Sequence, residues 1–343
     1  MPKSRQSKKH GGKFIYAGAF GCAFGPALKC QGSNTRKNGY ISKLIEGTEA
    51  EKEWSAASVV RSLNSSFKYF VYPDEKCHPA SANSSDEVDK CALQFSNPML
   101  LLSPNGGKDL THLEVMLTDV PAYFKGFLNV FDGVALLHAN EIVHKDIKLS
   151  NIIGLKMKDG TFNLRLIDFG LSRSFSHVIN YPKIDNYAYW PYDVRFLYDQ
   201  VNPTKEDISA FLKASEYLHF PKWILKNDDG SSKINLKLGL KIMKQIREGG
   251  DEAKKHILRQ SEVYALGRSL YEAYYFCTSY VSNDKGTCSK TDSTYPDIDK
   301  KATLALYDLV GKMCDVNPFE RLKLEDAKRG LAELIPVFAK VFV

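Results

Sequence analysis

The chain has 343 residues, a hydrophobic content of 43%, a charged content of 25% and a formal net charge of +7. This length exceeds the size at which a single hydrophobic core stops growing, and the composition is that of an ordinary soluble globular protein. No apolar run is long enough to span a bilayer, and the basic start lacks the apolar stretch of a secretory signal. We therefore expect an intracellular, cytoplasmic protein with two lobes and no membrane contact.

Positive charge gathers in two places. Residues 1–12 carry Lys3, Arg5, Lys8 and Lys9 without an acid, and residues 201–260 carry twelve Lys and Arg against eight Asp and Glu. The first stretch has no apolar periodicity, which predicts a disordered basic tail. Contact of this tail with an acidic partner or a nucleic acid is the weaker alternative, because no nucleic-acid-binding motif accompanies the charge.

The cysteines predict a reducing environment. The chain has seven of them, an odd number, and none is spaced as CxxC. Free thiols are the expected state, and a bridge between Cys77 and Cys91 is the alternative.

The residues 144–151 read His-Lys-Asp-Ile-Lys-Leu-Ser-Asn. An acid at Asp146, a Lys two residues later and an Asn five residues later suit phosphoryl transfer to a hydroxyl group. The acid accepts the proton, Lys148 neutralises the migrating phosphoryl group, and Asn151 holds a metal ion. Such a string also fits a solvated loop, so its meaning depends on its neighbours. It resembles the H-R-D-x-K-x-x-N catalytic loop of protein kinases, with Lys145 in the place of the Arg.

A second motif follows at a fitting distance. Residues 155–157 and 163–167 form an expected hairpin around Asp159-Gly160, which leads into Asp168-Phe169-Gly170, twenty-two residues after Asp146. This tripeptide resembles the D-F-G motif of protein kinases. The resemblance implies that Asn151 and Asp168 bind magnesium.

The first structured stretch, residues 14–23, predicts a strand-turn-strand unit with glycines at its turn. Glycines let backbone N–H groups approach phosphates. The stretch resembles the glycine-rich loop of kinases, although Tyr16 stands in the place of the first Gly. The resemblance implies nucleotide contacts from Gly18, Phe20, Gly21 and Ala23.

A strand expected over residues 39–45 carries Lys43, in a segment that resembles the V-A-I-K strand of kinases. Ile41 and Lys43 share one face by period-2 alternation, so the Lys side chain is expected to point toward the covered side. The resemblance implies that Lys43 contacts the α- and β-phosphates.

The next helix is expected to start at a capping box formed by Thr48 and Glu51 and to run to about Leu63. The kinase resemblance implies a Glu on this helix that pairs with Lys43. Glu53 is the first choice, because Glu51 is assigned to the cap.

Residues 68–72 and 98–102 predict strands, with a polar loop over residues 74–89 between them and a break at residues 104–107 that suits a hinge between lobes. By resemblance, Leu101 is the gatekeeper residue and Leu102 faces the adenine edge.

Beyond the hinge, apolar residues recur at helical spacing over residues 121–140. An activation-segment-like stretch, residues 171–189, ends at Trp190-Pro191-Tyr192-Asp193. Glu262 stands where kinases place the Asp of D-x-W-x-x-G, and residues 315–321 resemble the D-P-x-x-R segment. The resemblance implies a buried ion pair between Asp193 and Arg321.

The residue before Asp146 bears on whether phosphorylation of the activation segment controls activity. In switchable kinases the Arg beside the catalytic Asp grips a phosphate on the activation segment, whereas Lys145 offers a point charge. We therefore expect activity without phosphorylation of Ser172, Ser174 or Ser176.

Together these motifs predict an α+β, two-lobed protein-kinase-like fold: an ATP-binding lobe of antiparallel strands and one helix over residues 13–104, and a mostly helical lobe over residues 105–343 with an insertion at about 198–260. The implied function is a serine/threonine kinase that uses ATP and Mg²⁺ on protein substrates. Details around residues 20–30 and 189–191 resemble kinases of large DNA viruses, which would work in infected-cell cytoplasm or in the virus particle. The alternatives are an aminoglycoside-type phosphotransferase, a pseudokinase or particle-structure protein, and a nucleic-acid-binding module.

Overall fold

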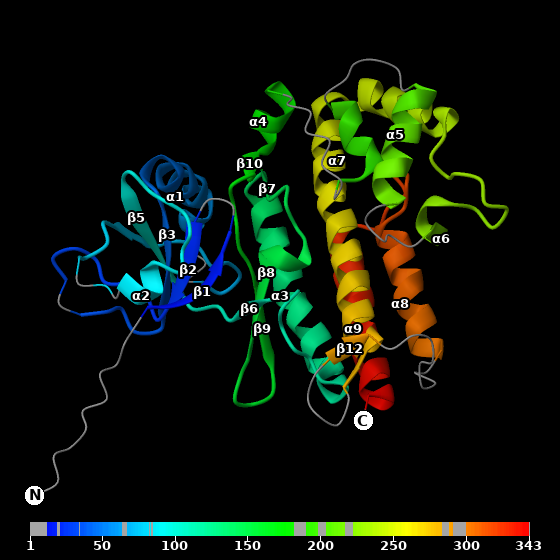
Figure 1. The fold of residues 1–343 in the computed structure, drawn as a ribbon. Coiled ribbons are helices and arrows are strands. Elements are labelled where there is room, and N and C mark those ends of the chain that lie inside the picture. The colour runs from blue at the N-terminus through cyan, green and yellow to red at the C-terminus, as the bar shows by residue number, and fades with distance from the viewer. Residues whose placement is uncertain are drawn as a thin grey trace, which may run out of the picture. The chain divides into compact units, whose positions relative to one another are not determined.

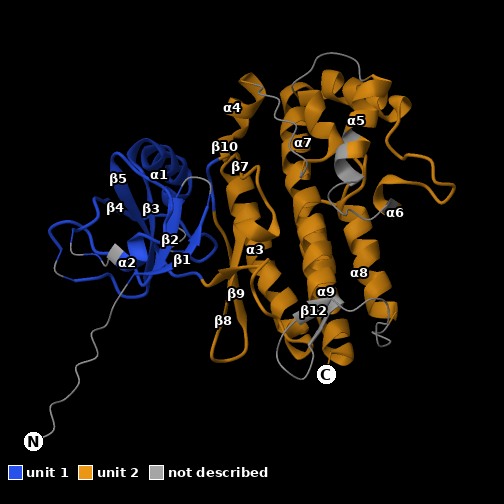
Figure 2. Cartoon of the chain, in the orientation of Figure 1, with its two compact units in different colours: residues 1–106, 168–170 blue, residues 107–167, 171–343 orange. Residues whose placement is uncertain are grey.

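The computed structural model describes residues 12–18, 21–33, 35–63, 67–81, 83, 85–181, 190–197, 204–216, 222–282, 288–290 and 300–342. Residues 1–11 of the expected basic tail, the candidate nucleotide-binding residue Phe20, and part of the insertion lie outside the described residues. The chain divides into two compact units, residues 1–106 with 168–170 and residues 107–167 with 171–343 (Figure 2). The boundary was expected between residues 104 and 105.

The first unit is built on an antiparallel sheet with the strand order β1-β2-β3-β5-β4. Its elements in chain order are β1 (Lys13–Ala17), β2 (Gly21–Gly25), β3 (Tyr40–Glu46), α1 (Gly47–Arg61), β4 (Glu75–Cys77), α2 (Ser85–Val88) and β5 (Pro98–Pro104). Figure 1 shows α1 lying against this sheet.

The two faces of this sheet are buried differently. On one face Phe24, Leu44, Leu100 and Leu102 join a larger apolar cluster. On the other face Leu101 packs with Ile45 and with Ala50 of α1. Because side chains alternate along a strand, residues 41, 43 and 45 all point to the face that α1 covers.

Gly21 is required where β2 meets β3. A Cβ at this position would lie 2.5 Å from the Leu44 carbonyl oxygen. A side chain here would therefore push the two strands apart, and the close approach depends on glycine.

Two local expectations for this unit are wrong. No strand covers Lys68–Tyr72. Phe70, Val71 and Tyr72 are consecutive and all buried, so their side chains pack in the core instead of alternating between two faces. The capping box is also absent, because α1 begins at Gly47 with Glu46 at the cap position.

Tertiary contacts replace that cap. The Gly47 N–H donates to the Asn97 carbonyl, and the Glu46 carboxylate accepts from the backbone N–H groups of Ser96 and Asn97. Hydrogen bonds from a segment distant in sequence thus replace the local capping box at the start of α1.

The expectation of free thiols is wrong for four cysteines. Cys22 is bonded to Cys91, and Cys30 to Cys77, with Cα separations of 5.9 and 5.7 Å. The alternative bridge between Cys77 and Cys91 is wrong as well. The partners lie 69 and 47 residues apart, and the folded sheet brings them within disulfide range.

The second unit is mainly helical. Its longer helices are α3 (Val120–Ala139), α5 (Lys205–Glu216), α7 (Leu236–Ser279), α8 (Lys300–Met313) and α9 (Leu324–Val341). Shorter elements are β6 (Lys108–Asp109), η1 (Leu117–Asp119), β7 (Ile142–Val143), η2 (Leu149–Asn151), β8 (Ile152–Lys156), β9 (Phe162–Leu166), β10 (Arg173–Ser174), α4 (Phe175–Asn180), η3 (Tyr192–Leu197), α6 (Lys222–Leu225), β11 (Tyr280–Ser282) and β12 (Cys288–Lys290). Within the described ranges, no helix combines the length and apolarity that crossing a membrane requires.

The core of the second unit is aromatic. Phe124 of α3 meets Phe338 of α9 with ring centroids 5.1 Å apart, and Tyr274 of α7 stacks on Phe338 at 5.9 Å. Figure 1 shows α3, α7 and α9 running side by side. The burial of Cys277 and Cys314 in this unit raises the pKa of each thiol to about 12.

Helix α7 changes direction at Gly250, where φ is 57° and ψ is −139°. Glycine adopts this left-handed backbone without a steric penalty. Glu262 lies in the part of α7 that follows this kink.

The two disulfides provide a test of the first unit. Nonreducing peptide maps should link Cys22 to Cys91 and Cys30 to Cys77. Their reduction should lower the free energy of unfolding by roughly 2–4 kcal/mol per bridge, because each bridge restricts the unfolded chain. Denaturant melts of the Cys22→Ser and Cys30→Ser variants measure each effect.

Cys277→Ala is the control, since reduction should shift its melting curve as much as that of the wild type. Peptide maps in which residues 22, 30, 77 and 91 are alkylated without prior reduction would contradict the pairing.

Candidate functional site: a catalytic loop and a strand lysine

The first part of the candidate site lies in the first unit and centres on Lys43. Its Nζ lies 2.7 Å from Glu53 Oε2 and 2.9 Å from Oε1. Both side chains are about one third exposed, and neither is fixed by burial. The pair forms because β3 points Lys43 toward α1, while Ala50, Glu53 and Ala57 share one helix face at spacings of three and four.

The predicted nucleotide contacts of this unit fall into two groups. Ala23 and Leu101 pair with Lys43 in the neighbouring strands, so the three residues form one row across the sheet. The Gly18 N–H donates to the Gly21 carbonyl at 2.8 Å and closes the β1–β2 turn. The Leu102 side chain does not join them, because it is buried in the apolar cluster on the opposite face.

The catalytic-loop motif lies in the second unit, between β7 and β8. Asp146 is 7% exposed. Its Oδ2 accepts from Asn151 Nδ2 at 2.7 Å, and its Oδ1 lies 3.0 Å from Lys148 Nζ. The three predicted residues are therefore in direct contact, with the carboxylate held from two sides.

The backbone of this loop is fixed by Glu262 of α7. Its Oε1 accepts from the N–H groups of His144 at 2.6 Å and Lys145 at 3.0 Å. Its Oε2 lies 2.9 Å from Nε2 of His138, on α3. A carboxylate that is 2% exposed thus joins two helices to the loop.

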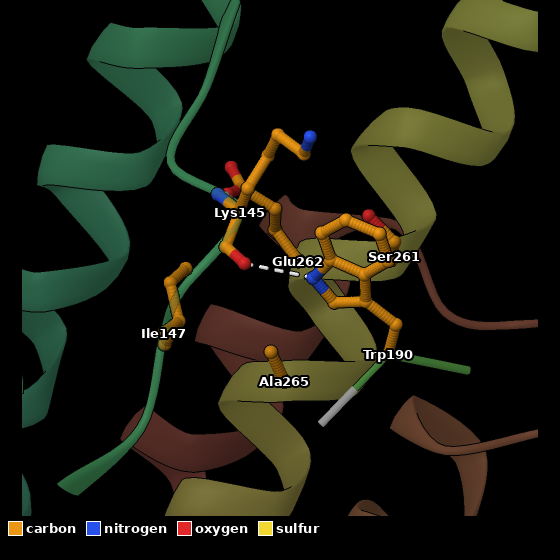
Figure 3. Close-up of a pocket in the computed structure, with 6 residues that line it drawn as sticks. All are labelled: Lys145, Ile147, Trp190, Ser261, Glu262 and Ala265. Atoms are coloured by element: carbon orange, nitrogen blue, oxygen red, sulfur yellow. Dashed lines mark hydrogen bonds between the residues drawn. The ribbon is translucent and has the colours of Figure 1, made fainter. Parts of the chain in front are cut away.

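The residue just before Asp146 is strained. Lys145 has a φ of 69°, in the left-handed region that a side chain disfavours. The bonds around it hold this conformation. Glu262 binds its N–H, and the indole Nε1–H of Trp190 donates to its carbonyl at 2.7 Å (Figure 3).

Asp168 follows β9 and is grouped with the first unit. It also has a positive φ, 62°, and its Oδ1 accepts from the Gly170 N–H at 3.2 Å. Phe169 is buried and meets Phe70 edge to face, with centroids 5.5 Å apart. The Asp168 carboxylate is exposed while its neighbour is anchored in the core.

The chemistry of two side chains suits magnesium. The Asn151 amide donates two hydrogen bonds through Nδ2, to the backbone and side-chain oxygens of Asp146, which orients the amide oxygen away from them. Asp168 offers an exposed carboxylate. Carboxylate and amide oxygens are the ligands that Mg²⁺ takes. These two residues therefore fit the ion that the motif implies.

The expected ion pair between Asp193 and Arg321 is confirmed. The Nη2 atom of Arg321 lies 2.8 Å from Asp193 Oδ1, and the two side chains are 1% exposed or less. Arg321 also donates to the carbonyls of Asp315 and Gln260. Tyr264, whose pKa is raised by burial and whose phenol is therefore neutral, lies under the guanidinium group at 5.3 Å.

Sequence reasoning missed two contributors to the loop. One is His138, because nothing in the sequence indicates its bond to a glutamate 124 residues away. Trp190 was noted as the end of the activation segment without a role.

Comparisons with known proteins agree with these motifs. The family model of the protein kinase domain matches residues 104–190. Cyclin-dependent kinase C-1 of Arabidopsis thaliana is 38% identical over 72 residues, which are 21% of this chain and 13% of that protein. Cyclin-dependent kinase 20 of Mus musculus is 35% identical over 96 residues, 24% of this chain and 27% of that protein.

The probable cyclin-dependent kinase 9 of Caenorhabditis elegans is 26% identical over 166 residues, 44% of this chain and 31% of that protein. The matches thus span less than a third of the length of these relatives. Over residues 104–190 the chain is thus similar to the protein kinase domain.

The ion pair predicts strong coupling in a double-mutant cycle. Asp193→Asn and Arg321→Met should each lower the free energy of unfolding by roughly 3–5 kcal/mol, because each change strands a buried polar partner. The double variant should lose clearly less than the sum of the two. Denaturant melts give the four values.

The exposed pair of Asp308 and Lys312, with contact at 2.6 Å, is the matched control. Its single variants should each cost less than about 1 kcal/mol. Additive losses in the Asp193 and Arg321 cycle would show that the buried pair contributes no coupling.

Proposed function

We propose that the chain is an ATP-dependent serine/threonine protein kinase. The observation that carries the proposal is the carboxylate of Asp146, held by Asn151 and Lys148 in a loop whose backbone is anchored from α7. A fixed carboxylate beside an ammonium group is what transfer of a phosphoryl group to a hydroxyl requires.

Three side chains of the second unit have a role in this proposal, those of Asp146, Lys148 and Asn151. Asp146 orients the acceptor hydroxyl and takes its proton as the oxygen bonds to the γ-phosphorus and the bond to ADP breaks. Lys148 offsets the charge that develops on the transferred group. Asn151 and Asp168 would each offer an oxygen ligand to magnesium, which would neutralise phosphate charge.

The first unit supplies the remaining contacts. Lys43, oriented by Glu53, binds the α- and β-phosphates, while the β1–β2 turn with Gly18, Phe20 and Gly21 covers them. Ala23 and Leu101 line the adenine side, and Leu102 contributes through its backbone. The row of Ala23, Lys43 and Leu101 on one face of the sheet supports this assignment.

A protein acceptor is favoured over a small molecule by the pair of Asp193 and Arg321. In protein kinases such a pair fixes the platform on which a peptide lies, and here it is buried and bidentate. Lys148, two residues after Asp146, favours Ser and Thr over Tyr as acceptors. The narrower resemblance to viral kinases, and contacts of the basic tail, stay predictions.

The test compares the wild type with Asp146→Asn. Phosphoryl transfer from γ-labelled ATP to a mixture of proteins should put label on Ser and Thr. In the variant the single-turnover rate should fall by about 10²–10⁴-fold, because the proton acceptor is lost. ATP affinity should stay within about twofold, because the carboxylate touches the acceptor and not the nucleotide.

Asp308→Asn on α8 is the control and should keep the wild-type rate. Kanamycin is offered as an acceptor in a parallel reaction. Label on kanamycin but not on protein would favour the small-molecule phosphotransferase. Binding of ATP without transfer to either would favour a pseudokinase.

A further inference from the structure

The peptide bond between Lys145 and Asp146 is held at both of its polar atoms. Its oxygen accepts from the indole Nε1–H of Trp190 at 2.7 Å. Its N–H donates to Nδ1 of His144 at 3.3 Å, and Nε2 of the same ring lies 3.1 Å from the Ile167 carbonyl. The orientation of this peptide plane sets the direction in which the Asp146 side chain leaves the backbone.

Trp190 contributes a second contact at the same place. The Lys145 ammonium group lies 4.7 Å from the centroid of the indole ring. One side chain thus binds both the carbonyl and the cation of the strained residue. Figure 3 shows the indole lying between the loop that carries Lys145 and helix α7 with Glu262.

The space beside this contact is nearly filled. Lys145, Ile147, Trp190, Ser261, Glu262 and Ala265 line a cavity of about 10 Å³. Such a volume holds at most one water molecule. The Lys145 ammonium group lies 4.7 Å from the indole centroid, so no group of the size of a phosphate separates the two side chains.

The serines of the activation-segment-like stretch already make hydrogen bonds within the protein. Ser172 is 1% exposed and donates to the His144 carbonyl at 3.2 Å. Ser174 caps α4 by accepting from the His177 N–H. The hydroxyl of Ser176 lies 3.2 Å from that of Ser174, so all three serines take part in hydrogen bonds within the protein.

We propose that Trp190 is a positioning residue for Asp146, acting through the Lys145 carbonyl and ammonium group. The indole takes the place that a phosphate on the activation segment has in switchable kinases, so that activity needs no phosphorylation of this segment. The proposal rests on the proposed kinase function and adds its mode of regulation.

The kinetic test uses full-length protein treated with phosphatase, with dephosphorylated casein and ATP as substrates. Trp190→Phe keeps a ring over Lys145 but removes the N–H donor, and kcat should fall about tenfold, the cost of one hydrogen bond to a strained backbone group. Trp190→Leu removes both contacts, and its kcat should fall further. KM for ATP should stay unchanged in both, which a general loss of folding would not produce.

Trp223→Phe is the matched control, because Trp223 is exposed and its ring packs against Tyr307 of α8. Its kcat should equal that of the wild type. The proposal is overturned if Trp190→Phe keeps full kcat, or if phosphatase treatment silences the wild type.

A second measurement does not depend on activity. The chain has three Trp residues, so a ¹⁵N spectrum contains three indole N–H signals, and the one that Trp190→Phe removes is that of Trp190. This signal should exchange slowly with solvent and should move in the Lys145→Met variant. A wild type without kinase activity would refute the proposed function, whereas an indole N–H that exchanges rapidly would refute the contact itself.

Discussion

The candidate site depends first on the buried carboxylate of Glu262. One oxygen binds the backbone N–H groups of His144 and Lys145, and the other binds His138. A buried charge is costly unless its lone pairs are satisfied, so each of these bonds also keeps the carboxylate in place. Because Glu262 lies on α7 and His138 on α3, the packing of two core helices sets where the catalytic loop begins. Lys145 then sustains a positive φ, and Asp146 follows it in a defined direction.

The first unit positions its charged group in another way. Lys43 and Glu53 are partly exposed, and neither makes the dense set of bonds that surrounds Asp146. What fixes them is the backbone beneath: strand pairing places Lys43 between Ala23 and Leu101, and α1 is anchored at its start by Asn97. The two disulfides connect β2 and β4 of this sheet to Cys91 and Cys30, which lie in segments between its strands. The Lys43 ammonium group thus stays accessible on a rigid support.

The sequence predicted the parts of the site that depend on local spacing. The order of Asp146, Lys148 and Asn151 within one loop brings them into contact, and period-2 alternation placed Lys43 on the face of α1. It could not predict contacts that depend on packing between distant segments. Hydrogen bonds from Asn97 replace the capping box expected at Thr48, and the disulfide partners lie 47 and 69 residues apart. The ion pair of Asp193 and Arg321 was predictable because the family resemblance supplied both residues.

The most direct test of this account is the single-turnover rate of phosphoryl transfer in Glu262→Ala, measured with saturating ATP and compared with the ATP dissociation constant. Removal of a charged acceptor should release the loop backbone and slow transfer by roughly 10–100-fold, since such hydrogen bonds are worth about 1.5–3 kcal/mol. ATP affinity and the circular dichroism spectrum should match those of the wild type. A folded variant that transfers phosphate at the wild-type rate would contradict the claim that Glu262 organises the catalytic loop.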